Sequence, residues 1–166
     1  MKDLSVITRV LLTLIAALFI NSCEKDKVED PPASGLIGNG KVVTSDIAGS
    51  WKVISFEDHE TSAKIIKTID NTWQCCNGDN TVTFIMSNST SGIIEGFNVT
   101  NSFHGNFTID QNGKIFIHNV IWTERGEPEW GYLFHSIEEA ETYEIDDGRL
   151  IIFYNQKKNS ITLQTN

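Results

Sequence analysis

The chain has 166 residues, of which 22 are acidic and 13 are Lys or Arg, so its formal net charge at pH 7 is −9. An acidic surface repels polyanions, and we therefore exclude nucleic acid as a partner. The length is enough for one folded domain with a sizeable core.

The first 22 residues have the pattern of a secretory signal. Lys2 and Arg9 flank an apolar run at 10–20. This run is too short to cross a bilayer, which takes roughly 20 helical residues. It ends in Phe-Ile-Asn-Ser-Cys, with Ser22 before Cys23, and this end resembles the lipobox of bacterial lipoproteins. The resemblance implies cleavage before Cys23 and acylation of its thiol and its new amino group. An ordinary signal peptide with a chance cysteine is the alternative, but charge, length and the small residue all favour the lipobox.

The chain therefore divides into a lipoprotein signal peptide at 1–22, a lipidated flexible tether at 23–45 and a β domain at 46–166. Two prolines and three glycines between 31 and 40 favour a flexible tether. Several acyl chains on Cys23 give stable anchoring, and we expect this anchor to hold the protein at the bacterial outer membrane. Lys25 and Asp26 match the signal by which one phylum of Gram-negative bacteria exports lipoproteins to the cell surface. A solvated charged tether explains the same two residues, and both interpretations stay open.

The only other thiols belong to the adjacent residues Cys75 and Cys76. Neighbouring Cα atoms lie about 3.8 Å apart, whereas a relaxed disulfide spans roughly 4.4–6.8 Å. A bridge between them would be strained and labile. No histidine stands at the spacing of a zinc site. We interpret the pair as small, mostly buried thiols near a turn.

From Ile47 onward, short alternating apolar segments and turn residues predict a mainly β domain. The sequence Asp-Gln-Asn-Gly at 110–113 joins two of these segments and predicts a hairpin. Further turns are predicted at Asn77 and Asp146. The six predicted strands are 51–56, 81–86, 105–109, 114–123, 150–154 and 160–163.

One segment, 128–143, has helical spacing instead. Its apolar residues and Glu141 fall on one helix face, and Pro128 stands where a first helical turn tolerates proline. The face consists of Trp130, Leu133, Phe134, Ile137, Ala140 and Glu141. We therefore expect a single antiparallel curled sheet or barrel of about eight strands with one covering α-helix.

Three stretches, 100–117, 121–123 and 132–154, resemble the META domain of secreted and lipid-anchored bacterial proteins of the heat-shock-associated type. The motif Asn-x-Phe-x-Gly is matched by Asn101, Phe103 and Gly105, and the opening Gly-Ser-Trp ends at Trp51. Two cysteines that the family often carries are missing, one of them replaced by Thr100. The resemblance implies a fold, because no catalytic set is attached to the motif.

The Gly-Ser-Trp opening is also similar to the Gly-x-Trp of lipocalins, and 75–84 resembles a segment of bacterial lipocalin-like lipoproteins. The lipocalin resemblance implies that Trp51 closes the floor of a barrel. A core aromatic on a first strand explains the same residue. We rank the META-like interpretation above the lipocalin-like one.

No motif in the chain predicts catalysis, a cofactor or a metal. The acidic run at 56–60 is consecutive and is interpreted as a solvated exit from a strand. His104, His118 and His135 are scattered, and His104 is interpreted as part of a turn. We therefore expect no enzyme.

The predicted function is a non-catalytic binding or interaction module whose partner is a protein, a glycan or a small apolar ligand. The alternatives are a lipocalin-like carrier of an apolar ligand and, less favoured, an enzyme with an unrecognised pocket. A barrel interior crowded with large side chains would favour the interaction module over the carrier.

Overall fold

The structure is a computed structural model and describes residues 47–73 and 78–166. The predicted signal peptide, the tether with Cys23, and the pair Cys75 and Cys76 lie outside the described residues. None of the helical segments in the described ranges has the length and apolarity needed to span a bilayer.

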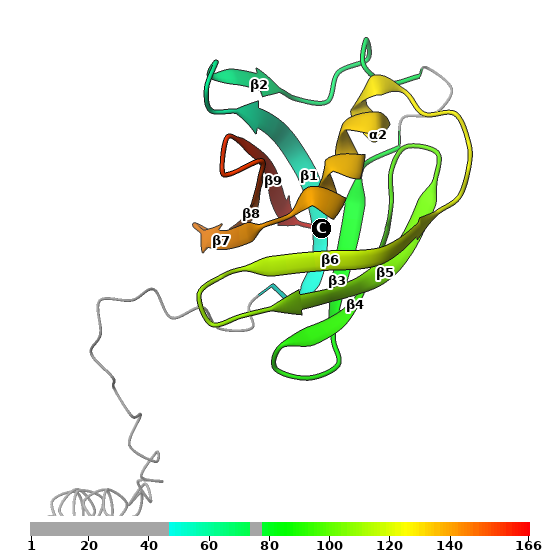
Figure 1. The fold of residues 1–166 in the computed structure, drawn as a ribbon. Coiled ribbons are helices and arrows are strands. Elements are labelled where there is room, and N and C mark those ends of the chain that lie inside the picture. The colour runs from blue at the N-terminus through cyan, green and yellow to red at the C-terminus, as the bar shows by residue number, and fades with distance from the viewer. Residues whose placement is uncertain (1–46, 74–77) are drawn as a thin grey trace, which may run out of the picture. The chain divides into compact units, whose positions relative to one another are not determined.

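The domain is built from nine antiparallel strands and one helical segment (Figure 1). The helical segment consists of α2 (Glu129–Leu133) and the 3₁₀ helix η1 (Phe134–Glu139). The strands are β1 (Gly49–Asp58), β2 (Ala63–Ile65), β3 (Thr81–Met86), β4 (Ser91–Phe97), β5 (Ser102–Ile109), β6 (Ile115–Trp122), β7 (Thr142–Asp146), β8 (Arg149–Tyr154) and β9 (Asn159–Thr165).

The strands form one sheet in the order β6-β5-β4-β3-β1-β9-β8-β7, with β2 paired to the second half of β1. Strands β3 to β6 follow one another as hairpins, and so do β7 to β9. Strand β1 joins these two groups, because it pairs with β3 on one side and with β9 on the other. The two edge strands meet at a single bridge between Lys114 and Thr142. The predicted curled antiparallel sheet of about eight strands is therefore confirmed.

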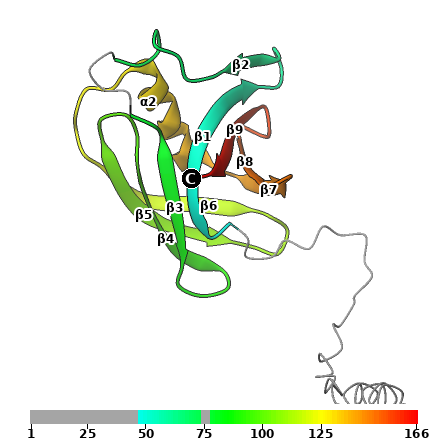
Figure 2. The same cartoon turned by 180° about the vertical axis from the view of Figure 1, so that it is seen from behind.

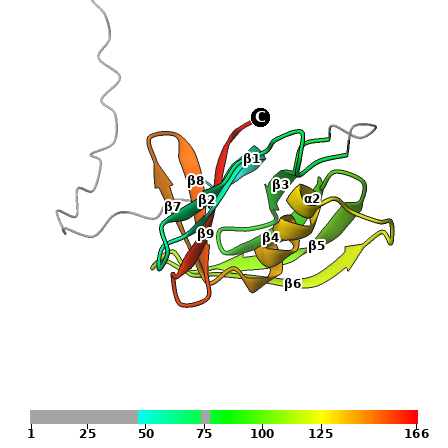
Figure 3. The ribbon, with the colours of Figure 1, turned by 90° about the horizontal axis from the view of Figure 1, so that it is seen from above.

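Side chains alternate between the two faces of the sheet, as the pleat requires. On β3, Val82 and Phe84 are buried, whereas Thr81 and Thr83 lie on the outer face. The buried residues of all the long strands share one core, which lies on the concave side of the sheet. Figure 3 looks down on the domain and shows α2 against this concave side.

The helical segment packs into the core but is less regular than the sequence predicts. The predicted helix over 128–143 is an α-helix for five residues, continues as 3₁₀ helix to Glu139, and gives way to β7 at Thr142. The reason is the spacing: Phe134, Ile137 and Ala140 recur every third residue, and a 3₁₀ helix places such residues on one face. All three are buried, as is Trp130, whereas Leu133 is half-buried and Glu141 is exposed.

Strand β4 was missed because Gly92 and Gly96 interrupt its apolar pattern. Each glycine faces a ring on β5: Gly92 is paired with Phe107, and Gly96 with Phe103. A β-carbon at either glycine would lie 2.8 Å from the Cε1 atom of the facing ring, so these rings occupy the space of the missing side chains.

Two of the predicted turns lie within the described residues and are present. In the hairpin at 110–113, the Asp110 carboxylate accepts hydrogen bonds from the backbone N–H groups of Asn112 and Lys114, at 2.8 and 3.0 Å. The β7–β8 hairpin turns at Asp147 and Gly148, whose φ angles of 48° and 71° are those of a type I′ turn. The turn predicted at Asn77 falls partly outside the described residues.

Candidate functional site

The concave interior, where a barrel would carry a ligand, is occupied by large side chains. Trp130 from α2 meets Phe56 edge-to-face with ring centroids 5.0 Å apart, and Phe84 meets Phe107 in the same way at 5.1 Å. The largest fully buried side chains are Trp130, Phe84, Phe107, Phe134, Ile47, Ile94, Ile137, Leu150, Ile152, Ile161, Leu163 and Val82. This interior is a packed core.

Trp51 belongs to that core. Its side chain is 5% exposed, and its indole Nε1 donates a hydrogen bond of 2.8 Å to the backbone oxygen of Ile47. A buried indole needs such a partner. Trp51 is therefore a structural residue of β1.

Asn101, in the predicted Asn-x-Phe-x-Gly motif, is also structural. The Oδ1 atom of Asn101 accepts hydrogen bonds from Thr123 Oγ1 at 2.9 Å and from the Arg125 backbone N–H at 2.7 Å. Its Nδ2 donates to Glu127 Oε1 at 2.6 Å and to the Arg125 backbone oxygen at 2.9 Å. Asn101 thus fixes the segment that leads from β6 into α2.

Phe103 and Gly105 complete the motif on β5, and both are buried. The Phe103 ring stacks on Trp122 of β6 at 4.4 Å between centroids and meets Phe134 edge-to-face at 5.7 Å. A β-carbon at Gly105 would lie 3.0 Å from Val120 Cγ2, next to the irregularity in the β5–β6 pairing. These motif residues hold the fold together.

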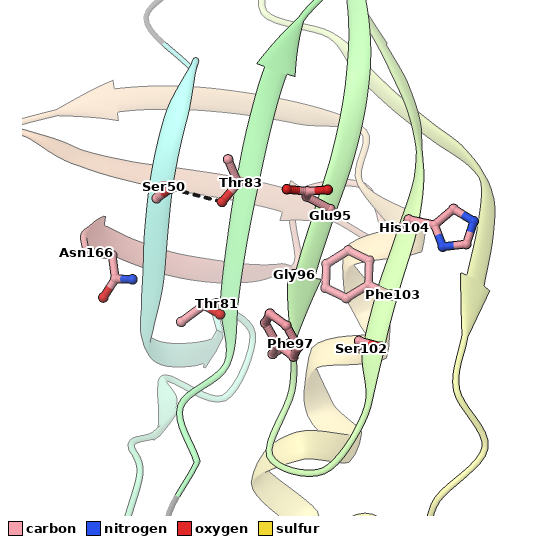
Figure 4. A pocket seen from close by; sticks show the side chains of 10 residues that line it. All are labelled: Ser50, Thr81, Thr83, Glu95, Gly96, Phe97, Ser102, Phe103, His104 and Asn166. Carbon is pink, nitrogen blue, oxygen red and sulfur yellow. Dashed lines mark hydrogen bonds between the residues drawn. The ribbon is translucent and has the colours of Figure 1, made fainter.

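One candidate site is a hollow of about 600 Å³ on the outer face of β1, β3, β4 and β5. Figure 2 shows these strands from the side opposite to the helix, and Figure 4 shows the hollow from close by. The residues that line it are Ser50, Thr81, Thr83, Glu95, Gly96, Phe97, Ser102, Phe103, His104 and Asn166. We call this site the outer hollow.

The strand register places the polar groups of the outer hollow in a row across the strands. Ser50 is paired with Thr83, Thr83 with Glu95, and Glu95 with His104. The hydroxyls of Ser50 and Thr83 share a hydrogen bond of 2.9 Å (Figure 4). The row therefore combines two hydroxyls, a carboxylate and an imidazole at one level of the sheet.

A second row contains the aromatic part of the outer hollow. Thr81 is paired with Phe97, and Phe97 with Ser102. The Phe97 side chain is 62% exposed, and Figure 4 shows its ring between the two neighbouring hydroxyl residues. A phenyl ring with this exposure, next to convergent polar groups, is a feature of a binding surface.

The rest of the outer face on β3 to β6 contains exposed apolar side chains among polar ones such as Thr108. Ile85 is paired with Ile93 on the neighbouring strand, and both are exposed. Phe116 and Ile121 of β6 are exposed as well, and the Phe116 ring stacks on His118 with centroids 5.2 Å apart. These residues surround the outer hollow but do not line it.

The three histidines that the sequence leaves unassigned lie on three different elements. His104 lines the outer hollow from the middle of β5, so its interpretation as part of a turn is wrong: the motif continues directly into a strand. His118 lies on β6. His135 lies on η1, where its ring contacts Trp122 at 4.1 Å between centroids.

A fourth histidine makes a contact that sequence reasoning missed. His59 Nε2 and Ser160 Oγ are 3.1 Å apart and share a hydrogen bond. Ser160 is 1% exposed and lies opposite Glu57 in the β1–β9 pairing. No sequence signal connects two residues that are so far apart in the chain. A serine nucleophile needs space for a substrate next to its oxygen, and the buried Ser160 hydroxyl does not have this space.

The acidic run at 56–60 spans the end of β1, as predicted. The Asp58 carboxylate accepts hydrogen bonds from the backbone N–H groups of Glu60 and Thr61, at 2.9 and 3.0 Å, and these bonds lower its pKa. A hydrogen bond from Lys64 at 2.7 Å lowers the pKa of Glu57. Within residues 47–73 and 78–166, no three His, Cys, Asp or Glu side chains are grouped as metal ligands.

No protein-family model and no curated protein matches this chain. One solved structure is similar: a DUF4847 family protein from Bacteroides vulgatus, with a TM-score of 0.52 and 16% sequence identity. The match covers 72% of this chain and 94% of that one. Because the identity is low, the similarity concerns the fold alone and assigns no role to any residue.

Proposed function

We propose that the protein is a lipid-anchored, non-catalytic binding module of the bacterial outer membrane. It engages its partner through the outer face of the sheet, where the outer hollow and its apolar surroundings lie. The observation that carries this proposal is the interior packed with large side chains, taken together with the hollow of about 600 Å³ on the outer face.

The packed interior supports a binding module over a lipocalin-like carrier. A carrier encloses its ligand among side chains that leave a cavity, whereas Phe84, Phe107 and Trp130 occupy that space here. An apolar ligand would have to displace these buried rings, and losing a buried aromatic costs about 3–5 kcal/mol. The META-like resemblance, which also implies a domain without a catalytic set, stays a prediction.

Three observations favour a binding role over catalysis. The described histidines lie on separate elements, and the one that meets a serine does so at a buried oxygen. The outer hollow contains a single carboxylate, from Glu95, so it lacks the pair of carboxyl groups that acid–base chemistry on a sugar requires. Its shape is wide and open, and does not exclude water.

Anchoring through Cys23 is the second part of the proposal and rests on the lipobox-like end of the signal sequence. Acylation there would hold the domain near a membrane surface through about 20 tether residues. Lys25 and Asp26 favour a further step, in which the anchored protein is exported to the cell surface.

A ligand titration of the Cys23→Ser chain tests the binding-module proposal against the carrier. We expect no saturable binding of palmitate or of an apolar naphthalene dye. A fatty-acid-binding protein measured under the same conditions is the positive control for the assay. One palmitate bound per wild-type chain, with the core intact, would overturn the proposal in favour of a carrier.

A further inference from the structure

We propose that the outer hollow binds a neutral oligosaccharide. This inference rests on the proposed function and deepens it by naming the chemical class of the partner. It follows from the types of side chain in the hollow and from their order across the strands.

A sugar ring presents hydroxyl groups around its edge and C–H groups on its faces, so its site needs an aromatic ring together with hydrogen-bonding groups. The Phe97 ring supplies an exposed apolar surface, and the register places Thr81 and Ser102 on its two sides. A sugar face stacked on this ring would have a hydroxyl residue at each edge (Figure 4).

The polar row that Ser50 begins supplies donors and acceptors for further hydroxyls. The Glu95 carboxylate accepts hydrogen bonds, the His104 imidazole donates or accepts, and the Thr83 hydroxyl does both. The hollow crosses four strands spaced about 4.8 Å apart, so it extends over roughly 14 Å. That length suits a short chain of sugar rings better than a single one.

The charges select a neutral sugar over an acidic one. Among the ten described residues that line the hollow, Glu95 has the one acidic side chain, and none is Lys or Arg. Lys52, next to Thr81 in the register, is paired with Asp79 at 3.4 Å. A sulfate, phosphate or uronate would therefore meet a carboxylate in the hollow and an acidic chain around it.

The sheet also disfavours an extended peptide. Peptides that add to a sheet need an edge with unpaired N–H and C=O groups. The hollow lies over β1, β3, β4 and β5, and each of these strands is already paired on both sides. A ligand in the hollow therefore contacts side chains and not free backbone groups of the sheet, and this suits an oligosaccharide.

A glycan array that contains neutral, uronic, sulfated and sialylated oligosaccharides tests the inference with the full-length chain. We expect binding to be confined to neutral structures, and titration of the best one should show at least about a tenfold loss of affinity for Phe97→Ala. Phe116→Ala is the matched control, since Phe116 is 63% exposed but lies outside the hollow. Glu95→Gln keeps the shape of the side chain, and it should weaken binding of the neutral sugar and reduce the discrimination against anionic glycans.

Three results would overturn the inference: no neutral oligosaccharide bound, equal loss of affinity in Phe97→Ala and Phe116→Ala, or preferred binding of anionic glycans. A purified protein partner that binds through Phe97 with no glycan present would overturn it too, but would leave the binding-module proposal standing. Saturable palmitate binding is the separate result that removes the binding-module proposal itself.

Discussion

The ring of Phe103 lies across Gly96 on the neighbouring strand, and Cα atoms of the two residues are partners in the β4–β5 register. Phe107 and Gly92 repeat the arrangement four residues further along. Each glycine gives a ring on β5 room to lie against the backbone of β4 and so to fill the concave core. At Gly92 and Gly96, the absence of a side chain is therefore what lets the core rings pack closely against the sheet.

Gly96→Ala should destabilise the domain by about 1–3 kcal/mol, the usual cost of overpacking. The new methyl group would collide with the Thr81 carbonyl oxygen, which the β3–β4 pairing holds in place, and would lie 2.8 Å from Phe103 Cε1. Urea unfolding followed by tryptophan fluorescence measures the change. Gly126→Ala is the control, because its nearest neighbour is the end of the exposed Trp73 side chain. Equal stability of the two variants would contradict the proposed close packing.

Trp51→Ala and Phe134→Ala should each lose about 3–5 kcal/mol and leave the protein mostly unfolded. Trp51 would lose both its buried indole and the hydrogen bond to Ile47, and Phe134 would lose its contact with Phe103. Far-UV circular dichroism with urea titration measures both. The exposed Phe116→Ala should change stability by about 0.5 kcal/mol at most. If Trp51→Ala melted like the parent but lost a partner, Trp51 would be a functional residue.

Asn101→Ala should cost about 1–3 kcal/mol, because it leaves buried donors and acceptors of the segment after β6 without partners. Asn101→Asp should cost more at pH 7, since its carboxylate would face the Glu127 carboxylate at the position where Nδ2 now donates a hydrogen bond. Urea unfolding at pH 7 and pH 4 compares the two variants. The prediction fails if Asn101→Asp is as stable as the parent at pH 7.

Asp79 should make the domain more stable at neutral pH than in acid. A hydrogen bond from Lys67 at 2.8 Å is the main cause that lowers the pKa of the Asp79 carboxyl, with the Lys52 charge as a further cause. Because the folded pKa is below the unfolded value of about 3.9, the stabilisation is present above about pH 4 and is lost as the pH falls through the folded pKa. Both partners are partly exposed, so we expect only about 0.2–1 kcal/mol at pH 7.

Urea midpoints between pH 2 and pH 7 for Asp79→Asn, Lys67→Met and the double variant measure this contribution as a coupling energy. The coupling should vanish at the acid end of the range. A coupling that is the same at pH 2 and pH 7 would rule out the ion pair as its source. The lowered pKa values of Glu57, Asp58 and Asp110 act in the same direction, so the whole domain should lose stability in acid.

Cys23→Ser should produce a chain without lipid, because the predicted acylation needs the thiol of Cys23. Labelling of cells with a radioactive fatty acid measures this directly, and the parent chain should carry the label into the membrane fraction. Cys75→Ser is the matched control and should stay labelled. Label retained on the Cys23→Ser chain would show that the lipobox interpretation is wrong.

Most of the sheet was predictable because the strand signal is local. Segments such as 81–86 alternate apolar and polar residues, and this alternation reflects the two faces of a pleated strand. The turn at Asp147 and Gly148 was visible for the same reason, because Asp-Asp-Gly at 146–148 is a local turn signal. The curling of the sheet was also predictable, because about eight antiparallel strands and a single helical segment favour a sheet that curls around that segment.

The outer hollow was not predictable, because it depends on β4 and on the register. Glu95 and Phe97 lie on a strand whose pattern is interrupted by glycines, and those glycines make sense only when the rings on β5 are known. His104 and Thr83 reach the same row through pairings between strands, which no local pattern encodes. The change from α to 3₁₀ helix at Phe134 was readable in principle from the three-residue spacing of the buried residues that follow.

The pairing of β1 with β9 determines when the domain is able to fold. Strand β9 is synthesised last, yet it lies next to β1 in the interior of the sheet, and the Asn166 backbone N–H donates to the Ser50 oxygen at 3.0 Å. The hairpins β3–β6 and β7–β9 are local, and the long pairing of β1 with β9 joins them, beside the bridge between Lys114 and Thr142. Such a high contact order slows folding. In a chain that lacks β9, the edges of β1 and β8 that pair with β9 stay unpaired. The sheet is therefore completed only when β9 is in place between β1 and β8.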